Sequence, residues 1–507
     1  MIVYIDSTEV PNASRCEIPN AVLRYIISKA ERYEQRCAML HGRYRGVPQI
    51  AKKHPESDEE IKVEANYAKY IVDITQGYYL SEPVKYDNND KSNVHSRKNT
   101  NASSLSMVSS IEAKLDKDTG KLMRHDVSQG IFEKEIDISP IIDCYHEQNI
   151  AEMDEKNGKN MGIYGESCEL VYASTDETPS PRSAVYPPDQ LILVQDNTVE
   201  HNDLFGMWFE KCESIDHTKY YRVSIYSEVA RRDYKSTDCS KDDFMFNPVG
   251  KAVQQAFGAV PIICYENNDE RQGDFEQVIS LIDARNELLS DRLTDKKNFV
   301  NALLALYGAI LSEEAQKAMK EDKFLDGLPN DAKMEYIQKT FDESSLKILD
   351  DTLVSEIHKM TLTPDMTDEN FSGNTSGVAL KLKLLALNIL VKSKMRSMEK
   401  GLKKRWKLYN NFLSKANNFT PVDIKDVDIV FTICMPIDEP SIVNMVCQLK
   451  NAGLVDDQTL LSLLWFVKDP AEALENMKQQ KQESLKQYRD SFENNTENSS
   501  DEDINGE

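Results

Sequence analysis

The sequence predicts an α+β fold, in which helical regions stand before and after one β-rich region. Short alternating runs separated by turns fill residues 161–265, a pattern typical of strands. On both sides of that region, apolar residues recur every three or four positions, which indicates amphipathic helices. At 507 residues the chain is long enough for two to four domains with sizeable cores.

The composition indicates a folded, acidic protein. Hydrophobic residues make up 40% of the chain and charged residues 29%, and the formal net charge is −24. No window approaches the roughly 18 apolar residues of a membrane span, and Asp6 and Glu9 stand where a signal peptide would be basic and then apolar. We therefore expect no membrane partner and a protein that stays in the compartment where it is made. The acidic total argues against a strong grip on nucleic acid, but it allows DNA to slide past.

Motifs of catalysis and metal binding are absent from the sequence. The nine cysteines form no Cys-x-x-Cys pair and have no histidine at metal-ligand spacing, so we interpret them as reduced thiols. There is no P-loop, Gly-x-Gly-x-x-Gly turn, Gly-x-Ser-x-Gly elbow or His-Glu-x-x-His helix. The nearest approach, residues 165–168, reads as a small-residue turn within a sheet. We predict no catalytic residue, no metal and no cofactor, and hence a protein that is not an enzyme.

The N-terminal region predicts two helices and a polar insertion. The first helix covers residues 12–40, and the second covers residues 61–76 and stops at Gly77. An extended piece follows over residues 78–86. Residues 87–135 are rich in Asn, Ser, Lys and Asp, which predicts an exposed, flexible insertion.

The middle of the chain predicts strands and then a helix pair. The strands cover residues 162–173, 191–195, 204–211, 220–228 and 260–265. Amphipathic helices follow at 274–297 and 345–360, with a smaller unit at 299–341 between them. This order suggests two antiparallel helices that carry a module at one end.

A long basic helix is the most unusual feature. Gly373 and Gly377 bracket a polar loop, and Thr375 and Ser376 are natural N-cap residues. The apolar spacing continues to Leu413 and predicts a buried stripe that includes Leu382, Leu385, Ile389, Met398, Leu402 and Phe412. Between Val378 and Lys415 there are eleven Lys or Arg and one acid, a local charge of +10 against −34 elsewhere. One interpretation pairs these cations with acids of a neighbouring helix or subunit, and the other places them on DNA phosphates.

The C-terminal region predicts one extended segment, a helical region and a tail. Residues 419–434 alternate like a strand, and residues 440–489 are helical. Gly453 ends one of these helices, Asp456 or Asp457 caps the next, and Pro470 opens a third. Residues 490–507 form an acidic tail that we expect to be disordered.

Several segments together resemble the portal proteins of tailed bacteriophages, specifically the family of long-tailed phages with headful packaging. They are Tyr67–Asp73, Gly77–Tyr86, Tyr164–Tyr172, Ala259–Ile262, Gly273–Glu276 and Asn370–Ala379. Each is weak alone, but their order and spacing make the similarity specific over most of the chain.

The resemblance implies a portal fold with a mixed α/β wing, antiparallel stem helices, a small α/β clip, a long kinked tunnel helix and an α-helical crown. In these terms residues 1–270 are the wing, 271–297 and 342–360 the stem, 298–341 the clip, 361–375 the tunnel loop, 376–435 the long helix and return to the wing, and 436–489 the crown. The 87–135 insertion departs from this pattern, and the resemblance assigns it no role.

The resemblance also implies function and partners. It implies a ring of about twelve subunits at one capsid vertex of the virion, assembled in the host bacterial cytoplasm, through which double-stranded DNA is packaged and ejected. Implied partners are the terminase large subunit, then a head completion or adaptor protein, and the scaffolding and major capsid proteins, whose procapsid assembly the ring would nucleate. The alternative is an oligomeric nucleic-acid-binding accessory protein that grips DNA through residues 378–415.

Site residues follow from the same comparison. The DNA tunnel loop would be Thr363, Pro364, Asp365, Thr367, Asp368, Asn370 and Phe371, with a loop–helix hinge at Gly373, Asn374, Ser376 and Gly377. Phosphate or inter-subunit contacts would come from Lys381, Lys392, Lys394, Arg396, Lys403, Lys404 and Arg405. The clip would meet terminase and adaptor through Glu313, Glu314, Lys317 and Lys320.

Overall fold

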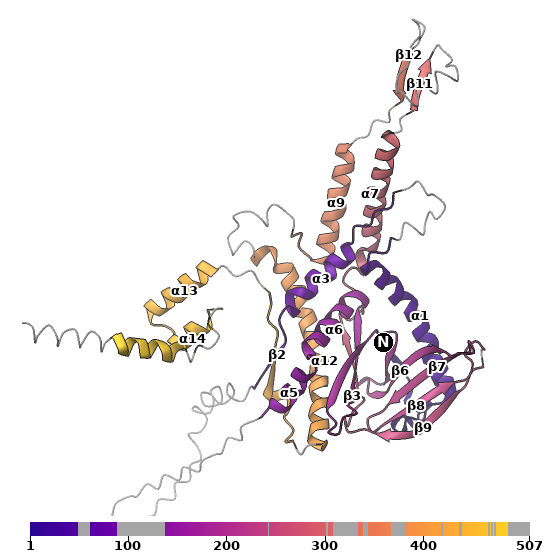
Figure 1. The fold of residues 1–507 in the computed structure, drawn as a ribbon, viewed down its shortest axis with the longest axis vertical. Coiled ribbons are helices and arrows are strands. Elements are labelled where there is room, and N and C mark those ends of the chain that lie inside the picture. The colour runs from indigo at the N-terminus through magenta and orange to yellow at the C-terminus, as the bar shows by residue number, and fades with distance from the viewer. Residues whose placement is uncertain are drawn as a thin grey trace, which may run out of the picture. The chain divides into compact units, whose positions relative to one another are not determined.

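The computed structural model describes most of the chain, in two compact units. Described are residues 1–48, 61–88, 137–241, 243–300, 303–307, 333–337, 343–366, 381–416, 419–434, 439–464, 467, 470 and 473–484. The first unit comprises residues 1–368 and 383–434, and the second comprises residues 369–382 and 435–507. Helices and strands both contribute strongly, which confirms the predicted α+β class (Figure 1).

A six-stranded sheet forms the largest β-layer of the first unit. Its order is β1-β5-β6-β7-β8-β9, with β1 parallel to β5 and the other neighbours antiparallel. The strands are β1 (Ile2–Ile5), β5 (Leu191–Asp196), β6 (Asp203–Glu213), β7 (Lys219–Tyr226), β8 (Ala230–Ser236) and β9 (Phe246–Gln254). Helix α1 (Asn20–Tyr44) packs Leu23, Ile26 and Ile27 against Phe205 and Val223 of this sheet. Burying this apolar face drives the pairing of helix and sheet.

A second, three-stranded sheet lies beside helices from both halves of the sequence. It has the order β10-β3-β4, from β10 (Ile262–Glu266), β3 (Glu166–Ala173) and β4 (Pro181–Tyr186). Helices α5 (Ser139–Glu147) and α6 (Ile150–Tyr164) precede it, and α6 ends at Gly165, whose φ of 85° allows the turn into β3. The long helix α12 (Leu385–Ala416) contacts both β10 and β4.

Two further antiparallel strand pairs join segments that are distant in sequence. Strand β2 (Lys85–Asn88) pairs with β13 (Val427–Val430), so the two segments predicted to be extended meet each other. Strands β11 (Leu303–Tyr307) and β12 (Lys333–Ile337) pair between the helices that flank them.

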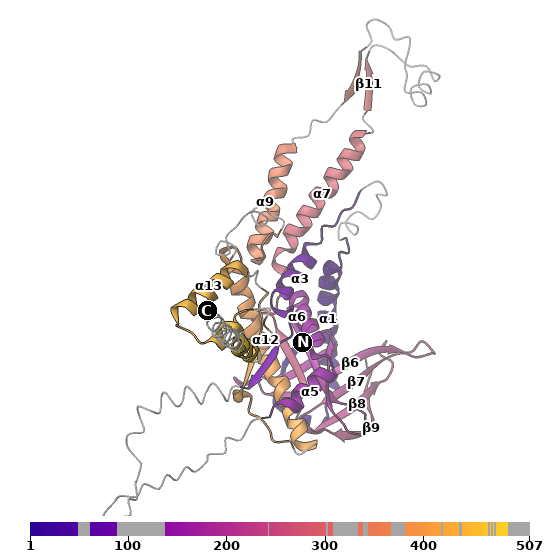
Figure 2. The same ribbon diagram turned by 60° about the vertical axis from the view of Figure 1, so that its left-hand side comes forward.

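Helices α7 (Ile279–Val300) and α9 (Glu343–Thr361) run side by side in both views (Figures 1 and 2). Arg285 of α7 forms an ion pair of 2.8 Å with Asp350 of α9, and Gln277 donates a hydrogen bond of 2.7 Å to the Met360 carbonyl. The predicted helix pair is therefore present, close to its predicted bounds.

An extended segment runs along α7 in regular register. The amides of Ile61, Val63 and Ala65 donate hydrogen bonds of 3.0–3.1 Å to side chains of α7, namely Thr294 Oγ1, Ser290 Oγ and Asn286 Oδ1. Two extended residues span about 6.6 Å and four helical residues about 6 Å, so the two repeats match over this distance. Helix α3 (Tyr67–Leu80) begins immediately afterwards, with Asn66 as its N-cap.

Several predicted boundaries were wrong. The first helix begins at Asn20 and not at residue 12, because Pro19 excludes helical geometry just before it. The second helix begins at Tyr67 and not at residue 61, since the backbone amides of Ile61, Val63 and Ala65 donate hydrogen bonds to α7 side chains. It continues through Gly77 to Leu80. Residues 162–164, predicted as strand, end helix α6. The predicted insertion 87–135 and tail 490–507 lie outside the described residues, apart from the end of β2.

The second unit contains the helices predicted near the C-terminus. Helix α13 (Glu439–Ala452) ends at Gly453, whose φ is 64°, and α14 (Asp457–Ser462) is capped by Asp456, whose side chain accepts from the Thr459 amide. Both assignments confirm the prediction from the sequence.

Candidate functional site

The first residues of the predicted tunnel loop are held firmly to α3 and α9. Leu362 adopts a left-handed φ of 55°, which turns the chain at the end of α9. The Tyr70 hydroxyl donates to the Pro364 carbonyl at 3.0 Å and accepts from the Met366 amide at 3.1 Å. Thr363 is buried, and its hydroxyl donates to the Thr361 carbonyl.

His358 supports the same segment from α9. Its Nδ1 lies 2.9 Å from the Thr363 carbonyl, and its Nε2 lies 3.9 Å from the Asp365 carboxylate. The rings of Tyr67 and Tyr70 pack edge-on against it at 5.8 Å. The start of the predicted loop is therefore anchored to His358, Tyr67 and Tyr70. The remaining predicted loop and hinge residues, Thr367, Asp368, Asn370, Phe371, Gly373, Asn374, Ser376 and Gly377, lie outside the described residues.

The buried face of α12 carries two cations among apolar side chains. Leu387, Val391, Met398, Leu402, Tyr409 and Phe412 form a stripe at helical spacing, and Lys394 and Arg405 occupy two positions of the same stripe. Lys394 is 2% exposed and Arg405 is 0% exposed. Both charges need partners, because an unpaired buried charge costs several kcal/mol.

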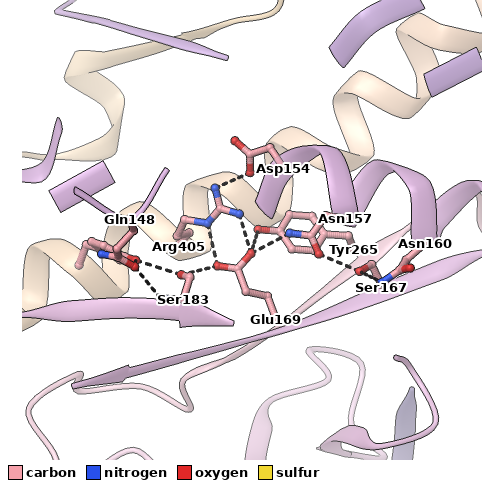
Figure 3. A network of polar contacts seen from close by, with 10 residues as sticks. Gln148, Asp154, Asn157, Asn160, Ser167, Glu169, Ser183, Tyr265 and Arg405 are labelled. Atoms are coloured by element: carbon pink, nitrogen blue, oxygen red, sulfur yellow. Dashed lines mark hydrogen bonds and ion pairs between the residues drawn. The ribbon is translucent and has the colours of Figure 1, made fainter. Parts of the chain in front are cut away.

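Arg405 is at the centre of a buried polar network (Figure 3). Its Nε and Nη2 donate to the two carboxylate oxygens of Glu169 at 2.8 and 2.6 Å, and its Nη1 donates to Asp154 at 2.6 Å. Glu169 also accepts from Asn157, Ser183 and Tyr265, at 2.9, 2.7 and 2.8 Å. The network thus connects α12 with α6, β3, β4 and β10.

Gly401 allows α12 to approach this sheet closely. A Cβ at position 401 would lie 2.3 Å from the Tyr265 ring, so no other residue fits without a shift. A glycine inside a helix costs about 1 kcal/mol relative to alanine. Here it permits the contact that brings Arg405 over β3.

The network holds one guanidinium and two carboxylates, and the pKa values of the two carboxylates are shifted in opposite directions. Burial raises the pKa of Asp154 to about 6, with the Glu169 charge adding to the shift and Arg405 opposing it. Burial acts against ionisation of Glu169 too, but Arg405 and the hydrogen bonds from Ser183 and Tyr265 outweigh it and lower the pKa of Glu169. Glu169 is therefore the main counter-charge of Arg405.

A second buried ion pair fastens α12 to the segment before α7. Lys394 Nζ lies 2.5 and 2.6 Å from the two carboxylate oxygens of Asp274. The Asn267 amide donates to the same carboxylate at 2.9 Å.

The other predicted cations of α12 are more exposed. Lys404 pairs with Asp203 of β6 at 2.5 Å, and Lys403 pairs with Glu399 one turn earlier in the helix at 2.5 Å. Lys381, Lys392 and Arg396 are exposed. Contact with phosphate or a neighbouring subunit stays a prediction for Lys381, Lys392 and Arg396. Lys394, Lys403, Lys404 and Arg405 have carboxylate partners within the chain.

The predicted apolar stripe of the long helix was wrong near its start. Leu382, Leu385 and Ile389 are 67%, 50% and 62% exposed, whereas Leu384, Leu387 and Val391 are buried. Apolar residues occur on both faces of this stretch, so spacing alone could not choose the face that packs on the body of the chain.

Sequence reasoning missed the acidic partners Asp154, Glu169 and Asp274. One signal was available for Glu169, which stands between Cys168 and the apolar run that begins at Leu170, so that its burial in the strand would require a counter-charge. The predicted clip residues Glu313, Glu314, Lys317 and Lys320 lie outside the described residues.

The described residues contain neither a metal site nor a membrane-spanning helix. No three His, Cys, Asp or Glu side chains within them come together as a metal site. Within the same residues, no helix has the length and apolar character needed to cross a bilayer.

Comparison with known families identifies the class of protein. Residues 23–487 match the family described as "Phage portal protein, SPP1 Gp6-like", and the chain belongs to this family. Among individual relatives, it is similar to the portal protein of Bacillus phage SPP1, with 21% identity over 347 residues. The matched part covers 66% of this chain and 66% of that relative, slightly less than two thirds of its length.

Proposed function

We propose that this chain forms a ring at one vertex of the phage capsid and that double-stranded DNA passes through the ring during packaging and ejection. Membership of the portal family, over residues 23–487, is the observation that carries this proposal. The protein would act as a structural conduit and as a nucleus for procapsid assembly, without catalysis of its own. The scaffolding and major capsid proteins would meet it at its periphery.

The charge distribution on α12 supports a channel that does not hold DNA tightly. Neutralising six or more phosphates would hold DNA strongly in place. Four of the seven predicted contact residues, Lys394, Lys403, Lys404 and Arg405, are engaged by carboxylates of the same chain. The start of the proposed tunnel loop presents Asp365, which is acidic.

The exposed apolar residues of α12 support assembly into a ring. Leu385 and Ile389 lie on the helix face opposite the buried stripe, and exposed apolar clusters mark contact surfaces. In a closed ring of identical subunits such a face would pack against the next copy.

The parts of the ring follow from the order of elements. Helices α7 and α9 would form the stem, and the segment between them, with the β11–β12 pair, would form the clip that meets the terminase large subunit and later the adaptor. The tunnel loop would follow α9, and residues 436–489 would form the crown.

End-on electron microscopy of the purified full chain tests the proposal. Closed rings with a central opening are expected. Sedimentation as a monomer or dimer at every salt concentration, without rings in the micrographs, would rule it out.

The alternative, a nucleic-acid-binding accessory protein, rests on the exposed cations Lys392 and Arg396. Replacing both by glutamate should weaken DNA binding if they grip phosphate, and the slope of log affinity against log salt concentration should become shallower by about two. Lys404 and Arg405 are unsuitable for this test, because their replacement breaks ion pairs inside the chain. If the double variant binds DNA as the wild type does, the alternative fails.

A further inference from the structure

A groove of about 790 Å³ lies where the two larger sheets approach each other. The three-stranded sheet contributes Tyr172, Arg182 and Tyr186 to it. The six-stranded sheet contributes Trp208, Arg222, Tyr226 and Arg231, from β6, β7 and β8. The end of β9 and the residues after it close the groove, with Phe412 of α12.

The groove combines aromatic walls with positive charge. Its walls include Tyr186, Trp208, Tyr226, Phe257 and Phe412, and most of its surface is apolar. Three arginines line it, and none of its lining residues in the described part of the chain is acidic. This is unusual in a chain whose net charge is −24.

The three arginines differ in how far they are neutralised. Arg182 pairs with Asp176 at 2.8 Å and Arg231 with Asp233 at 3.1 Å, in both cases with partly exposed side chains. Such exposed pairs contribute little and can be exchanged for a new partner. The side chain of Arg222 is exposed and has no hydrogen bond or ion pair to any described residue.

A buried donor also lacks an acceptor at this place. Trp208 packs edge-on against Tyr186 at 6.2 Å, and its Nε1 is buried without a hydrogen-bond partner among the described residues. Buried indole N–H groups are ordinarily satisfied, so an acceptor supplied from outside would be favourable.

An open strand edge continues from the groove. β9 is the last strand of its sheet, and eight of its nine residues are exposed. Among them Val249 and Val253 are 54% and 64% exposed, and Val253 also lines the groove. Unprotected edges that carry apolar side chains are surfaces for another extended chain.

We infer that this groove is a docking site for an extended segment of another protein that carries carboxylates beside an aromatic or aliphatic side chain. The apolar side chain would enter between Tyr186, Trp208 and Phe257. The carboxylates of the docked segment would pair with Arg222 and Arg182. A carbonyl or carboxylate oxygen of the same segment would accept a hydrogen bond from Trp208 Nε1. The site does not depend on the channel, because α12 contributes only Phe412 to it.

Two short fluorescent peptides with a central phenylalanine test the inference on the full-length chain, one flanked by glutamates and the other by lysines. Fluorescence anisotropy should show binding of the acidic peptide that weakens as salt rises, and no binding of the basic peptide. Arg222→Gln should weaken the acidic peptide about fivefold. Trp208→Phe, which keeps an aromatic ring and removes the donor, should weaken it about threefold.

Arg32→Gln is the matched control, because Arg32 is an exposed arginine on α1 and does not line the groove. Its affinity for the acidic peptide should equal that of the wild type. Equal binding of both peptides, binding of neither, or an Arg222→Gln variant with unchanged affinity would overturn the inference. If neither peptide binds and Arg222→Gln disturbs ring formation, the groove is instead a contact between copies of this chain.

Discussion

The two ends of helix α12 use charged and apolar residues in opposite ways. From Lys394 onward the helix buries Lys394 and Arg405 in ion pairs with Asp274, Glu169 and Asp154. Toward its start it exposes the apolar side chains of Leu385 and Ile389. The two cations are buried where the chain supplies carboxylate partners, and the two apolar side chains are exposed where the described residues do not cover them. The part from Lys394 onward therefore stabilises the fold of the single chain, and the exposed start of the helix is the part that we propose packs against another copy.

The largest effect on the free energy of unfolding is expected from Arg405→Met, which removes the cation of the buried network. The substitution leaves two buried carboxylates without their cation, which should cost about 3 to 5 kcal/mol. Urea unfolding of wild type and variant measures the difference. Lys403→Met is the control, because Lys403 is exposed and pairs only within the helix, and it should change stability by less than about 0.5 kcal/mol. Similar losses in both variants would contradict the assignment of the network.

Lys394→Met should have the next largest effect, about 2 to 4 kcal/mol, because Asp274 would remain buried and unpaired. The double variant Lys394→Met with Asp274→Asn should recover part of this loss, since no bare charge is left. Lys392→Met is the control, because Lys392 lies two positions away and is exposed. Its free energy of unfolding should equal that of the wild type. A double variant no more stable than the single one would show that packing, and not charge, dominates at this position.

The two carboxylates of the network should respond to pH with opposite signs. Burial raises the pKa of Asp154 from 3.8 to about 6, so the folded state holds its proton more tightly, and stability from this group falls as pH rises from about 4 to 6. Asp154→Asn should therefore be at least as stable as the wild type at pH 7, by up to about 3 kcal/mol, and the difference should become small near pH 4.

Glu169→Gln provides the comparison within the same network. The pKa of Glu169 is lowered in the folded protein, so its contribution is present above the ordinary pKa of 4.5 and is lost as pH falls through the folded value. Glu169→Gln should thus destabilise the protein at neutral pH and approach the wild type in acid. The unfolding midpoints of both variants, each taken relative to the wild type, should be measured from pH 7 down to below pH 4. Differences that change with pH in the same direction for both variants would refute this division of roles.

The smallest effect on stability is expected from Ile389→Asp, at the exposed end of α12. The side chain is already 62% exposed, so the isolated subunit should unfold within about 0.5 kcal/mol of the wild type. Assembly should suffer instead, because an aspartate would be buried against the next copy. Sedimentation velocity and electron microscopy should show subunits or fragments in place of rings. Val391→Asp, on the buried face, should by contrast fail to fold, and rings that form normally with Ile389→Asp would remove this face from the proposed interface.

Much of the fold could be predicted, because local signals agreed with the tertiary arrangement. Gly453 ends α13 and Asp456 caps α14, as expected. The predicted ends of α7 and α9 lie within a few residues of the observed ends. Helix α6 was missed, because it buries Asp154, Asn157 and Gly158 and shows no apolar stripe. The hydrogen-bond partners of these polar side chains lie on α12 and β3. A pattern of apolar spacing within the helix cannot indicate partners on other elements.

The sequence alone determined the α+β class, the amphipathic helices, their caps and the basic character of α12, because these depend on neighbours a few positions apart. Only the tertiary structure decided which of those cations are buried and which face of α12 remains open. Arg405 meets its acids 236 and 251 positions earlier in the chain, and Lys394 meets Asp274 across 120 positions. Ion pairs at such separations arise from the folded arrangement of sheets and helices, so the buried cations of the basic helix connect it to the rest of its own chain.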